Sequence, residues 1–398
     1  MAESLLRSGA WVDADRIRNY SRILILLTAL SVTWLLATSH GFVMDDRQPV
    51  GTDFYGIYSA GVLAQHNAAA LAYDWPTHRE IQQQLILGTD AFYGWCYPPP
   101  FLLIAGLLAL FSYPLALLLW QAATLAFYLF SQRVILRPAT SEWLLPSLGF
   151  TGVFINLLNG HNGFLSAALF GMGLALLRTR PFIAGLLLGA LCYKPQFGLL
   201  IPLALIAGRQ GKAFIGASIS VIALCLAATL AYGEAIWPAF FASLEPTRVI
   251  VLEQGDTGWY KIQSLFSFIR ALGGSVPLAY AIHGAIAIAV AVVTACAWRR
   301  HGAHPLSCAL LITGSLIVTP YVLDYDLTML APAIAFLAVH GLNNGFASYQ
   351  RSLLALAWCM PLLARITMQH VGIPLGFLTV FLLFAHTAYW ARQNSHER

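Results

Sequence analysis

The chain has 398 residues, of which 59% are hydrophobic and 10% charged, and its mean hydropathy is +0.70. A soluble core of ordinary proportions cannot hide so much apolar surface, so the composition excludes a soluble globular protein and predicts an all-α polytopic membrane protein. The formal net charge of +5 is small and is scattered through short loops as Arg and Lys pairs, which excludes a nucleic-acid partner.

Apolar stretches of membrane-helix character follow one another along the chain, each bounded by Pro, Gly or charge. They begin near residues 23, 101, 115, 143, 164, 182, 213, 276, 306, 328, 353 and 375. They predict about 12 transmembrane helices in one integral membrane domain over residues 1–398. Arginines cluster before the first helix, which places residues 1–22 in the cytoplasm, and an even number of helices returns residues 392–398 to the same side.

The charged loops agree with this topology only in part. Most loop cations fall on the inner side, but strict alternation places two pairs outside, Arg133/Arg137 and Arg178/Arg180. The apolar segments between residues 143 and 177 are also short for full crossings. We expect half-helices that meet at the polar break Asn159-Gly-His-Asn-Gly163, where backbone groups need hydrogen bonds inside the protein.

Two long segments are expected on the outer side, residues 44–97 and 234–263. The first is rich in Trp, Tyr and His and predicts two short interfacial helices, over residues 53–71 and 76–87, which would form the lid or floor of a cavity. Ionisable groups at a membrane edge are costly unless they have a task. The acids of these segments therefore indicate chemistry on a lipid-borne substrate.

Asp53 stands where the chain leaves the bilayer after its first apolar run. Its carboxylate could act as a general base that takes a proton from an acceptor hydroxyl. It could equally be an N-cap, since Asp before Phe-Tyr-Gly-Ile-Tyr is also how an interfacial helix begins. The residues alone favour the cap.

Lys194 is a lone cation in an apolar segment, next to the helix-breaking Pro195. An unwound turn there would present Lys194 and Gln196 to an anion such as a phosphodiester. The alternative is a lysine that snorkels to the interface from a kinked helix.

Further polar groups fit two interpretations each. The amides and imidazole of Asn159, His161 and Asn162 are either sugar-hydroxyl ligands or caps of two helix ends. Asp324 and Asp326 follow Pro320 and could bind a sugar, balance a lysine, or cap the next helix.

The segment after residue 258 has an amphipathic pattern. Lys261 and Gln263 follow Trp259 and Tyr260, with Arg270 about two turns later, so the segment could offer cations to a lipid phosphate or anchor an aromatic belt. The six cysteines lack a Cys-x-x-Cys spacing, so we expect neither disulfides nor a metal site. No Gly-rich nucleotide cradle and no cofactor pattern is evident.

The order of these motifs resembles glycosyltransferase family 87, within the C-type (GT-C) superfamily of polyprenyl-phosphate-sugar-dependent enzymes. The similarity runs roughly from Ile23 to Leu337 and lies in the following succession: Asp53 with Tyr58, Tyr97-Pro-Pro-Pro100, Leu119-Trp120, Asn159-Gly-His-Asn-Gly163, Tyr193-Lys-Pro-Gln196, and Gln263-Ser264 with Arg270. Relatives usually have Gly-Gln-Asn where this chain has Gly160-His161-Asn162. They include mannosyltransferases of phosphatidylinositol mannosides and an arabinofuranosyltransferase.

The resemblance implies a GT-C-type bundle in the bacterial inner membrane, a lipid-linked sugar donor, a lipid or glycan acceptor, and a periplasmic active site. It implies that Asp53 is the general base of an inverting transfer that needs no metal or other cofactor. Cations near the departing phosphate would be Lys194, Lys261 and Arg270. Sugar- or acceptor-binding residues would be Tyr58, Tyr97, Asn159, His161, Asn162, Gln196, Gln263, Asp324 and Asp326.

Two other classes of function stay open at the level of sequence. A transporter or flippase for a lipid-linked sugar would also use broken helices and a mid-membrane lysine, although no inverted repeat is evident. A scaffold without catalytic activity would leave so many polar residues on one face unexplained. The oligomeric state is not predicted.

Overall fold

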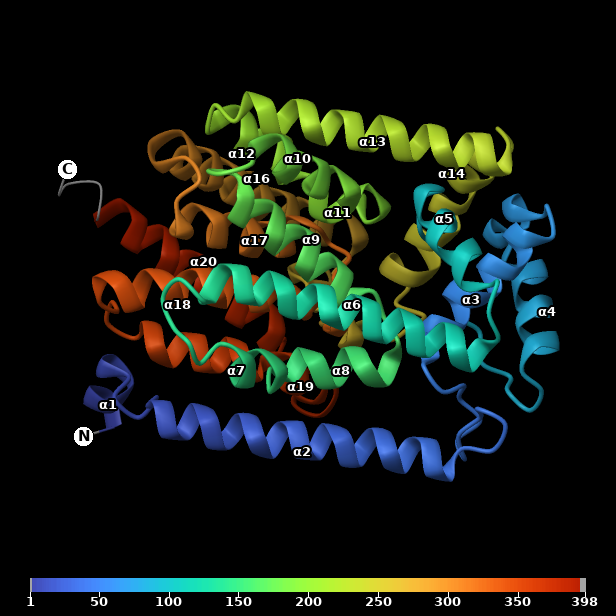
Figure 1. Cartoon of the computed structure of the whole chain (residues 1–398), viewed down its shortest axis with the longest axis horizontal. Helices are drawn as coiled ribbons and strands as arrows, with labels where there is room; N and C mark the ends of the chain where they lie inside the picture. Colours follow the sequence, from blue (N-terminus) through green and yellow to red (C-terminus); the bar gives the residue numbers. More distant parts are fainter. Residues whose placement is uncertain (1, 394–398) are drawn as a thin grey trace.

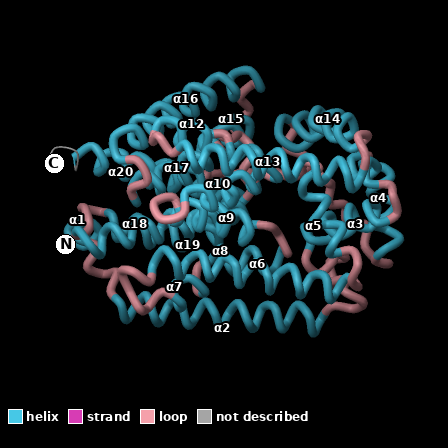
Figure 2. The backbone as a smooth tube through the Cα atoms, turned by 45° about the horizontal axis from the view of Figure 1, so that its top comes forward, coloured by secondary structure: helices cyan, strands magenta, loops and turns pink. Residues whose placement is uncertain are grey.

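The computed structural model describes residues 2–393, and within this range the secondary structure is helical apart from isolated β-bridges. Figure 2 shows helix in nearly every part of the chain, with α2 along one edge of the bundle. Of the expected C-terminal tail, residues 394–398 lie outside the described residues.

Within residues 2–393, six helices are long and apolar enough to cross a membrane, which confirms a helical membrane protein. They are α2 (Ala14–Thr38), α6 (Tyr113–Leu136), α13 (Gly211–Tyr232), α16 (Val276–His301), η5 with α18 (Asp324–Met329 and Leu330–Asn344), and α19 (Gln350–Val371). Shorter helices between them are α7 (Leu144–Leu148), α8 (Thr151–Asn159), α9 (Gly163–Leu176), α10 (Pro181–Gly189), η2 (Ala190–Tyr193), α11 (Pro195–Gly198), α12 (Leu200–Ala207) and α17 (Pro305–Val318). The chain begins with α1 (Ala2–Ser8), and its last described helix is α20 (Leu375–Gln393).

The helix predicted to cross from residue 101 does not do so. It is α5 (Pro100–Leu108), whose nine residues rise only about 14 Å, roughly half the hydrocarbon thickness. Conversely, α11 and α12 add an apolar segment between α10 and α13 that was not predicted. Helix lengths alone therefore do not establish twelve full crossings.

Because α5 is too short to cross and α11 with α12 adds a segment, Arg133/Arg137 and Arg178/Arg180 lie at the other end of the bundle from the one expected. Figure 1 shows both termini at one end of the bundle, and α6 and α9 both run towards that end. Arg133 lies in the last turn of α6 and Arg137 follows it, and Arg178 and Arg180 follow α9, so all four join the cations beside the termini. Direct contacts hold this end together: Tyr349 N donates to Arg7 O, Arg18 pairs with Glu142, and Gly208 lies against Trp298.

At the opposite end, residues 44–97 form the expected short helices, namely α3 (Thr52–Gln65), η1 (Ala69–Tyr73) and α4 (Trp75–Leu85). However, α3 does not lie on a surface, because nearly all of it is buried against α5 and η1. A buried polar contact of 2.7 Å between Ser59 Oγ and His78 Nε2 joins α3 to α4. Burial lowers the pKa of His78 to about 4, so this imidazole is neutral and structural.

Residues 234–263 are also helical rather than an extended loop. They form α14 (Ile236–Pro246), the π-helical turn η3 (Thr247–Glu253) and η4 (Trp259–Lys261), and α15 (Leu265–Ala271) follows. An isolated bridge between Ile262 and Leu323, with a 2.6 Å hydrogen bond from Gln263 N to Val322 O, joins this segment to the start of η5. The fold thereby brings two distant outer segments next to each other.

Candidate active site

The site is built around two broken helices. The first break separates α8 from α9 at Asn159-Gly-His-Asn-Gly163, as predicted. Gly160 adopts a left-handed conformation with φ of 63°, and a Cβ there would lie 2.7 Å from Phe54 Cβ. The freed carbonyls are satisfied inside the protein: Trp120 Nε1 donates to Gly160 O at 3.0 Å, and Asn156 Nδ2 donates to His161 O at 3.0 Å.

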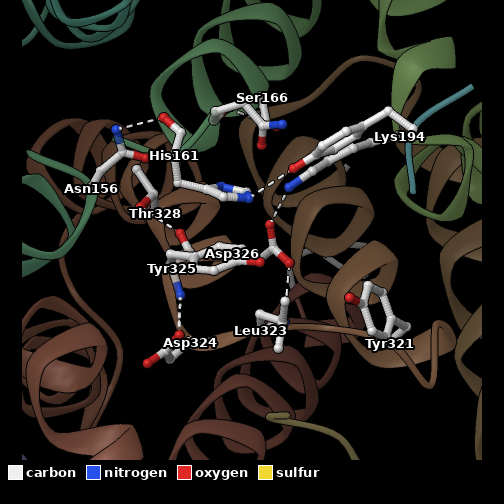
Figure 3. A network of polar contacts seen from close by, with 12 residues as sticks. Asn156, His161, Ser166, Lys194, Tyr321, Leu323, Asp324, Tyr325, Asp326 and Thr328 are labelled. Atoms are coloured by element: carbon white, nitrogen blue, oxygen red, sulfur yellow. Dashed lines mark hydrogen bonds and ion pairs between the residues drawn. The ribbon is translucent and has the colours of Figure 1, made fainter. Parts of the chain in front are cut away.

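The second break lies at Lys194, between η2 and α11, which confirms the unwound turn before Pro195. The lysine does not snorkel, because its side chain is 4% exposed and its Nζ lies 2.6 Å from Asp326 Oδ1. The rings of Phe197 and Tyr325 flank the ammonium group at 5.5 Å and 5.6 Å. The other oxygen of Asp326 accepts from Leu323 N at 3.0 Å, so this carboxylate is held from both sides, as Figure 3 shows.

Asp324 has its own cation. One carboxylate oxygen accepts from Tyr325 N at 3.0 Å, and the other forms an ion pair with Arg365 Nε on α19. Arg365 was not among the predicted site residues. The signal was nevertheless present, because Arg365 is a cation within an apolar stretch of α19, a feature similar to the one that drew attention to Lys194.

His161 connects the first break to this acidic turn. Its ring stacks on Tyr325 with centroids 3.4 Å apart, and its Nε2 lies 3.0 Å from Tyr97 Oη. Figure 3 shows His161, Tyr325, Lys194 and Asp326 gathered in one place.

Asp53 lies beside these residues on the first turn of α3. It does not cap that helix, because the N-cap is Gly51 and no side-chain cap bond is formed. Thr52 ties this turn to the first break, with Oγ1 3.2 Å from Asn159 Oδ1 and 3.5 Å from Asp53 Oδ2. Within residues 2–393 no cation lies within ion-pair distance of Asp53.

The surroundings of Asp53 in the protein favour the neutral form of its carboxyl group more strongly than bulk water would. Although the side chain stays partly accessible, its carboxylate lies deep among protein atoms, and desolvation raises its pKa to about 7. The charge of Asp324 raises the pKa further, and Lys261, Arg365 and Lys194 oppose it in that order. This carboxyl can therefore both accept and release a proton near neutral pH.

The remaining predicted residues divide into two groups. Lys261 on η4 is close enough for its charge to act on Asp53, and the buried Gln263 follows it, with Nε2 donating to Tyr260 O at 2.9 Å. Gln196 is half-buried two residues after Lys194 at the second break. Tyr58 and Arg270 are not brought to the site.

Tyr58 and Arg270 serve other parts of the fold. Tyr58 points into the packing of α3, where its hydroxyl donates to Phe111 O at 2.9 Å and its ring meets Tyr113 edge-on. Arg270 donates from Nε and Nη2 to Glu253 O at 3.1 Å and 2.9 Å, and from Nη1 to Gly274 O. Its guanidinium thus fastens η3 to the end of α15.

Several buried polar atoms around the breaks have no hydrogen-bond partner in the described part of the chain. They are His161 Nδ1, Asn162 Nδ2 and Oδ1, and Asn156 Oδ1, whereas Gln263 Oε1, which also lacks a partner among the described residues, lies near Gly376 on α20. Buried polar groups are normally satisfied, so such a cluster fits a hydroxyl-rich ligand. No group of three or more His, Cys, Asp or Glu side chains within the described ranges is arranged to hold a metal ion.

Comparison with known proteins gives one family. The family model of glycosyltransferase family 87 matches residues 95–320, which is more than half of the chain. The match includes Tyr97, the first break, Lys194 and Lys261, whereas Asp53, Asp324 and Arg365 lie outside it. A search of curated proteins found no match, and a search of solved structures found none either.

Proposed function

Because the chain belongs to glycosyltransferase family 87 and is a membrane glycosyltransferase, we propose that it transfers a sugar from a polyprenyl-phosphate donor to a lipid or glycan acceptor. The sugar is mannose, another hexose or a pentose. The transfer takes place on the periplasmic side of a bacterial inner membrane, with both termini in the cytoplasm. The gathering of loop arginines at the end that holds the termini supports this orientation.

This orientation also bears on which helices cross the membrane. We assign one crossing each to α7 with α8, to α10 with η2 and to α11 with α12, alongside the long helices and α9, α17 and α20, in a GT-C-type bundle of about 12 spans. Both breaks then lie towards the outer half of the membrane beside the two acids of η5, and Thr52 ties the turn of Asp53 to the first break. Non-helical backbone at that depth is tolerated because the protein satisfies its polar groups.

The observation that carries the proposal is the contrast among the three acids of the site. Asp324 and Asp326 are each committed to a cation, whereas Asp53 has no ion-pair partner among the described residues. A carboxylate in such a position is free to take a proton from an acceptor hydroxyl. Its pKa of about 7 means that losing and regaining this proton are both easy at neutral pH.

The reaction is a single displacement. Asp53 removes the acceptor hydroxyl proton while the acceptor oxygen bonds to the anomeric carbon. The bond from that carbon to the phosphate oxygen breaks, and its electron pair stays on the departing polyprenyl phosphate. Attack opposite the leaving group inverts the anomeric centre, and no metal or other cofactor is needed in this scheme.

Sugar recognition is assigned to the unsatisfied polar atoms around the first break. His161 Nδ1 and both amide atoms of Asn162 can exchange hydrogen bonds with sugar hydroxyls, and Tyr97 and Asn159 flank them. Gln263 Oε1, also unpaired among the described residues, is a further candidate from the segment after η4. Tyr58 supports α3 from within its packing. Asp324 and Asp326 shape the site through their cations, and Gln196 lies at the edge of the second break.

The test is transfer by the full chain in lipid nanodiscs. Radiolabelled polyprenyl-phosphate mannose, with total bacterial membrane lipid as acceptor, should give a labelled glycolipid. Asp53→Asn should remove this product while the protein still elutes as a single folded species. Asp90→Asn, which removes an exposed acid paired with Arg47, is the matched control and should transfer normally.

Two results would contradict the proposal. Transfer by Asp53→Asn at the wild-type rate would exclude Asp53 as the base. Uptake of the lipid-linked sugar by proteoliposomes, without any transfer product from several sugar donors, would favour the transporter alternative.

A further inference from the structure

The three cations of the site, and Arg270 outside it, differ in how many hydrogen-bond donors they have left for a ligand. Lys194 is almost completely buried, paired with Asp326 and flanked by two aromatic rings. Arg270 uses Nε, Nη1 and Nη2 on backbone carbonyls. Neither of these cations is well placed to receive a further anion.

Arg365 is different. Only its Nε is used, in the pair with Asp324, and its two terminal amino groups have no hydrogen-bond partner in the described part of the chain. Its side chain is 38% exposed, whereas the Asp324 side chain is 2% exposed. The acid therefore anchors the guanidinium from the buried side, while the fork of Nη1 and Nη2 remains available.

Lys261 lies on an element that packs against the helix of Arg365. It belongs to η4, which packs against α19, the helix that carries Arg365. The positive charges of Lys261 and Arg365 both act on Asp53, so both lie near the proposed base. No carboxylate within residues 2–393 forms an ion pair with Lys261.

We propose that Arg365, together with Lys261, binds the phosphate group of the prenyl-phosphate donor and of the prenyl phosphate that departs. This inference rests on the proposed function and identifies the anion site within it. A guanidinium fork matches two oxygens of one phosphate, and a mobile ammonium group suits a third contact. The departing monoester carries more negative charge than the diester, so these contacts strengthen as the anomeric bond breaks.

The experiment compares farnesyl phosphate with farnesol as inhibitors of sugar transfer by the full chain in nanodiscs. The two probes share an isoprenoid chain and differ in the phosphate. Wild type should prefer farnesyl phosphate. Arg365→Gln should lose about tenfold to a hundredfold of this preference, the range for a hydrogen bond to a charged group, and should bind farnesol unchanged. Arg47→Gln, which removes an exposed outer arginine, should keep the full preference.

A second variant separates phosphate binding from charge balance. Arg365→Gln alone leaves Asp324 buried without its cation and can fail to fold. The double variant Arg365→Gln/Asp324→Asn removes both charges, so it should fold yet still lack the phosphate preference. Wild-type preference in the double variant would overturn the inference, because Arg365 would then only neutralise Asp324.

The inference and the proposed function fail in different ways. Wild type that transfers sugar but binds both probes equally would overturn the phosphate site and leave the transferase intact. Wild type that neither transfers sugar from any polyprenyl-phosphate donor nor discriminates between the probes would overturn the proposed donor class itself.

Discussion

Lys194 and Asp326 form an ion pair of 2.6 Å between Nζ and Oδ1, although 131 residues separate them in the chain and neither side chain is more than 4% exposed. The pair joins the break before α11 to the turn η5, which also carries Asp324 and Tyr325. It therefore holds together the two segments that frame the candidate site.

Removing one partner of this pair should destabilise the protein strongly. Lys194→Met or Asp326→Asn leaves a buried charge without a partner, which costs about 3–5 kcal/mol. The double variant Lys194→Met/Asp326→Asn should recover much of that loss, because no charge is then left unpaired. Thermal unfolding in detergent measures all three. Single variants as stable as wild type would show that water reaches the pair.

Transfer should depend on pH through Asp53. The pKa of this carboxyl is about 7 because burial disfavours its charged form. Only the ionised form accepts a proton, so kcat/KM should fall tenfold per pH unit below about 7 and level off above it. Rates between pH 5 and pH 9 with a saturating acceptor lipid give the profile. A flat profile across that range would contradict the assignment of the base.

The same carboxyl should make folding sensitive to pH in a predictable direction. Its pKa in the folded protein is raised, so the stability it contributes is fully present below its unfolded value of about 3.9 and is lost as the pH rises through about 7. Asp53→Asn removes the ionisable group and avoids this loss. Its unfolding temperature should exceed that of wild type at pH 8.5, by a smaller margin at pH 5. Equal margins at both pH values would contradict a raised pKa.

His161 should tolerate replacement by glutamine but not by leucine. The imidazole exchanges one hydrogen bond with Tyr97 Oη, and an amide can do the same. His161→Leu leaves the buried phenol unpaired, at a cost of about 1–3 kcal/mol. Unfolding temperatures and transfer rates of the two variants provide the comparison. Equal losses in both would mean that stacking on Tyr325, rather than the hydrogen bond, is what matters.

The first break should not accept a side chain at Gly163. A Cβ there would lie 2.5 Å from Asn156 Oδ1 and 2.9 Å from Thr328 Oγ1, so Gly163→Ala should cost about 1–3 kcal/mol. Gly198→Ala is the matched control, because a Cβ at Gly198 meets nothing within 4 Å. Denaturation of both variants in the same detergent tests the difference. An unchanged Gly163→Ala would show that the break is loosely packed.

The breaks themselves were predictable from local sequence. Glycines and asparagines around His161, and a proline after Lys194, disfavour continuation of a helix through local backbone effects. The choice between a cap and a base for Asp53 was not predictable in this way. It depended on Gly51 occupying the cap position and on which cations the fold places around the carboxylate.

The membrane topology was likewise only partly predictable from the local sequence. Apolar length identified the long helices, yet α5 has a hydrophobic start like that of a spanning helix and ends after nine residues against α3. The correction moves Arg133 and Arg178 to the end of the bundle that holds the termini. Arg365 was missed for a related reason, since a charge near a helix end has no visible partner until Asp324 is brought beside it.

By itself, then, the sequence determined that this is a helical membrane protein of glycosyltransferase family 87 with two interrupted helices, because composition, helix breakers and motif order are local properties of the chain. Only the tertiary structure decided which acids are neutralised and which one is left unpaired. That outcome depends on distances between residues far apart in sequence, and the strength of a buried charge interaction is set by those distances and by the exclusion of water.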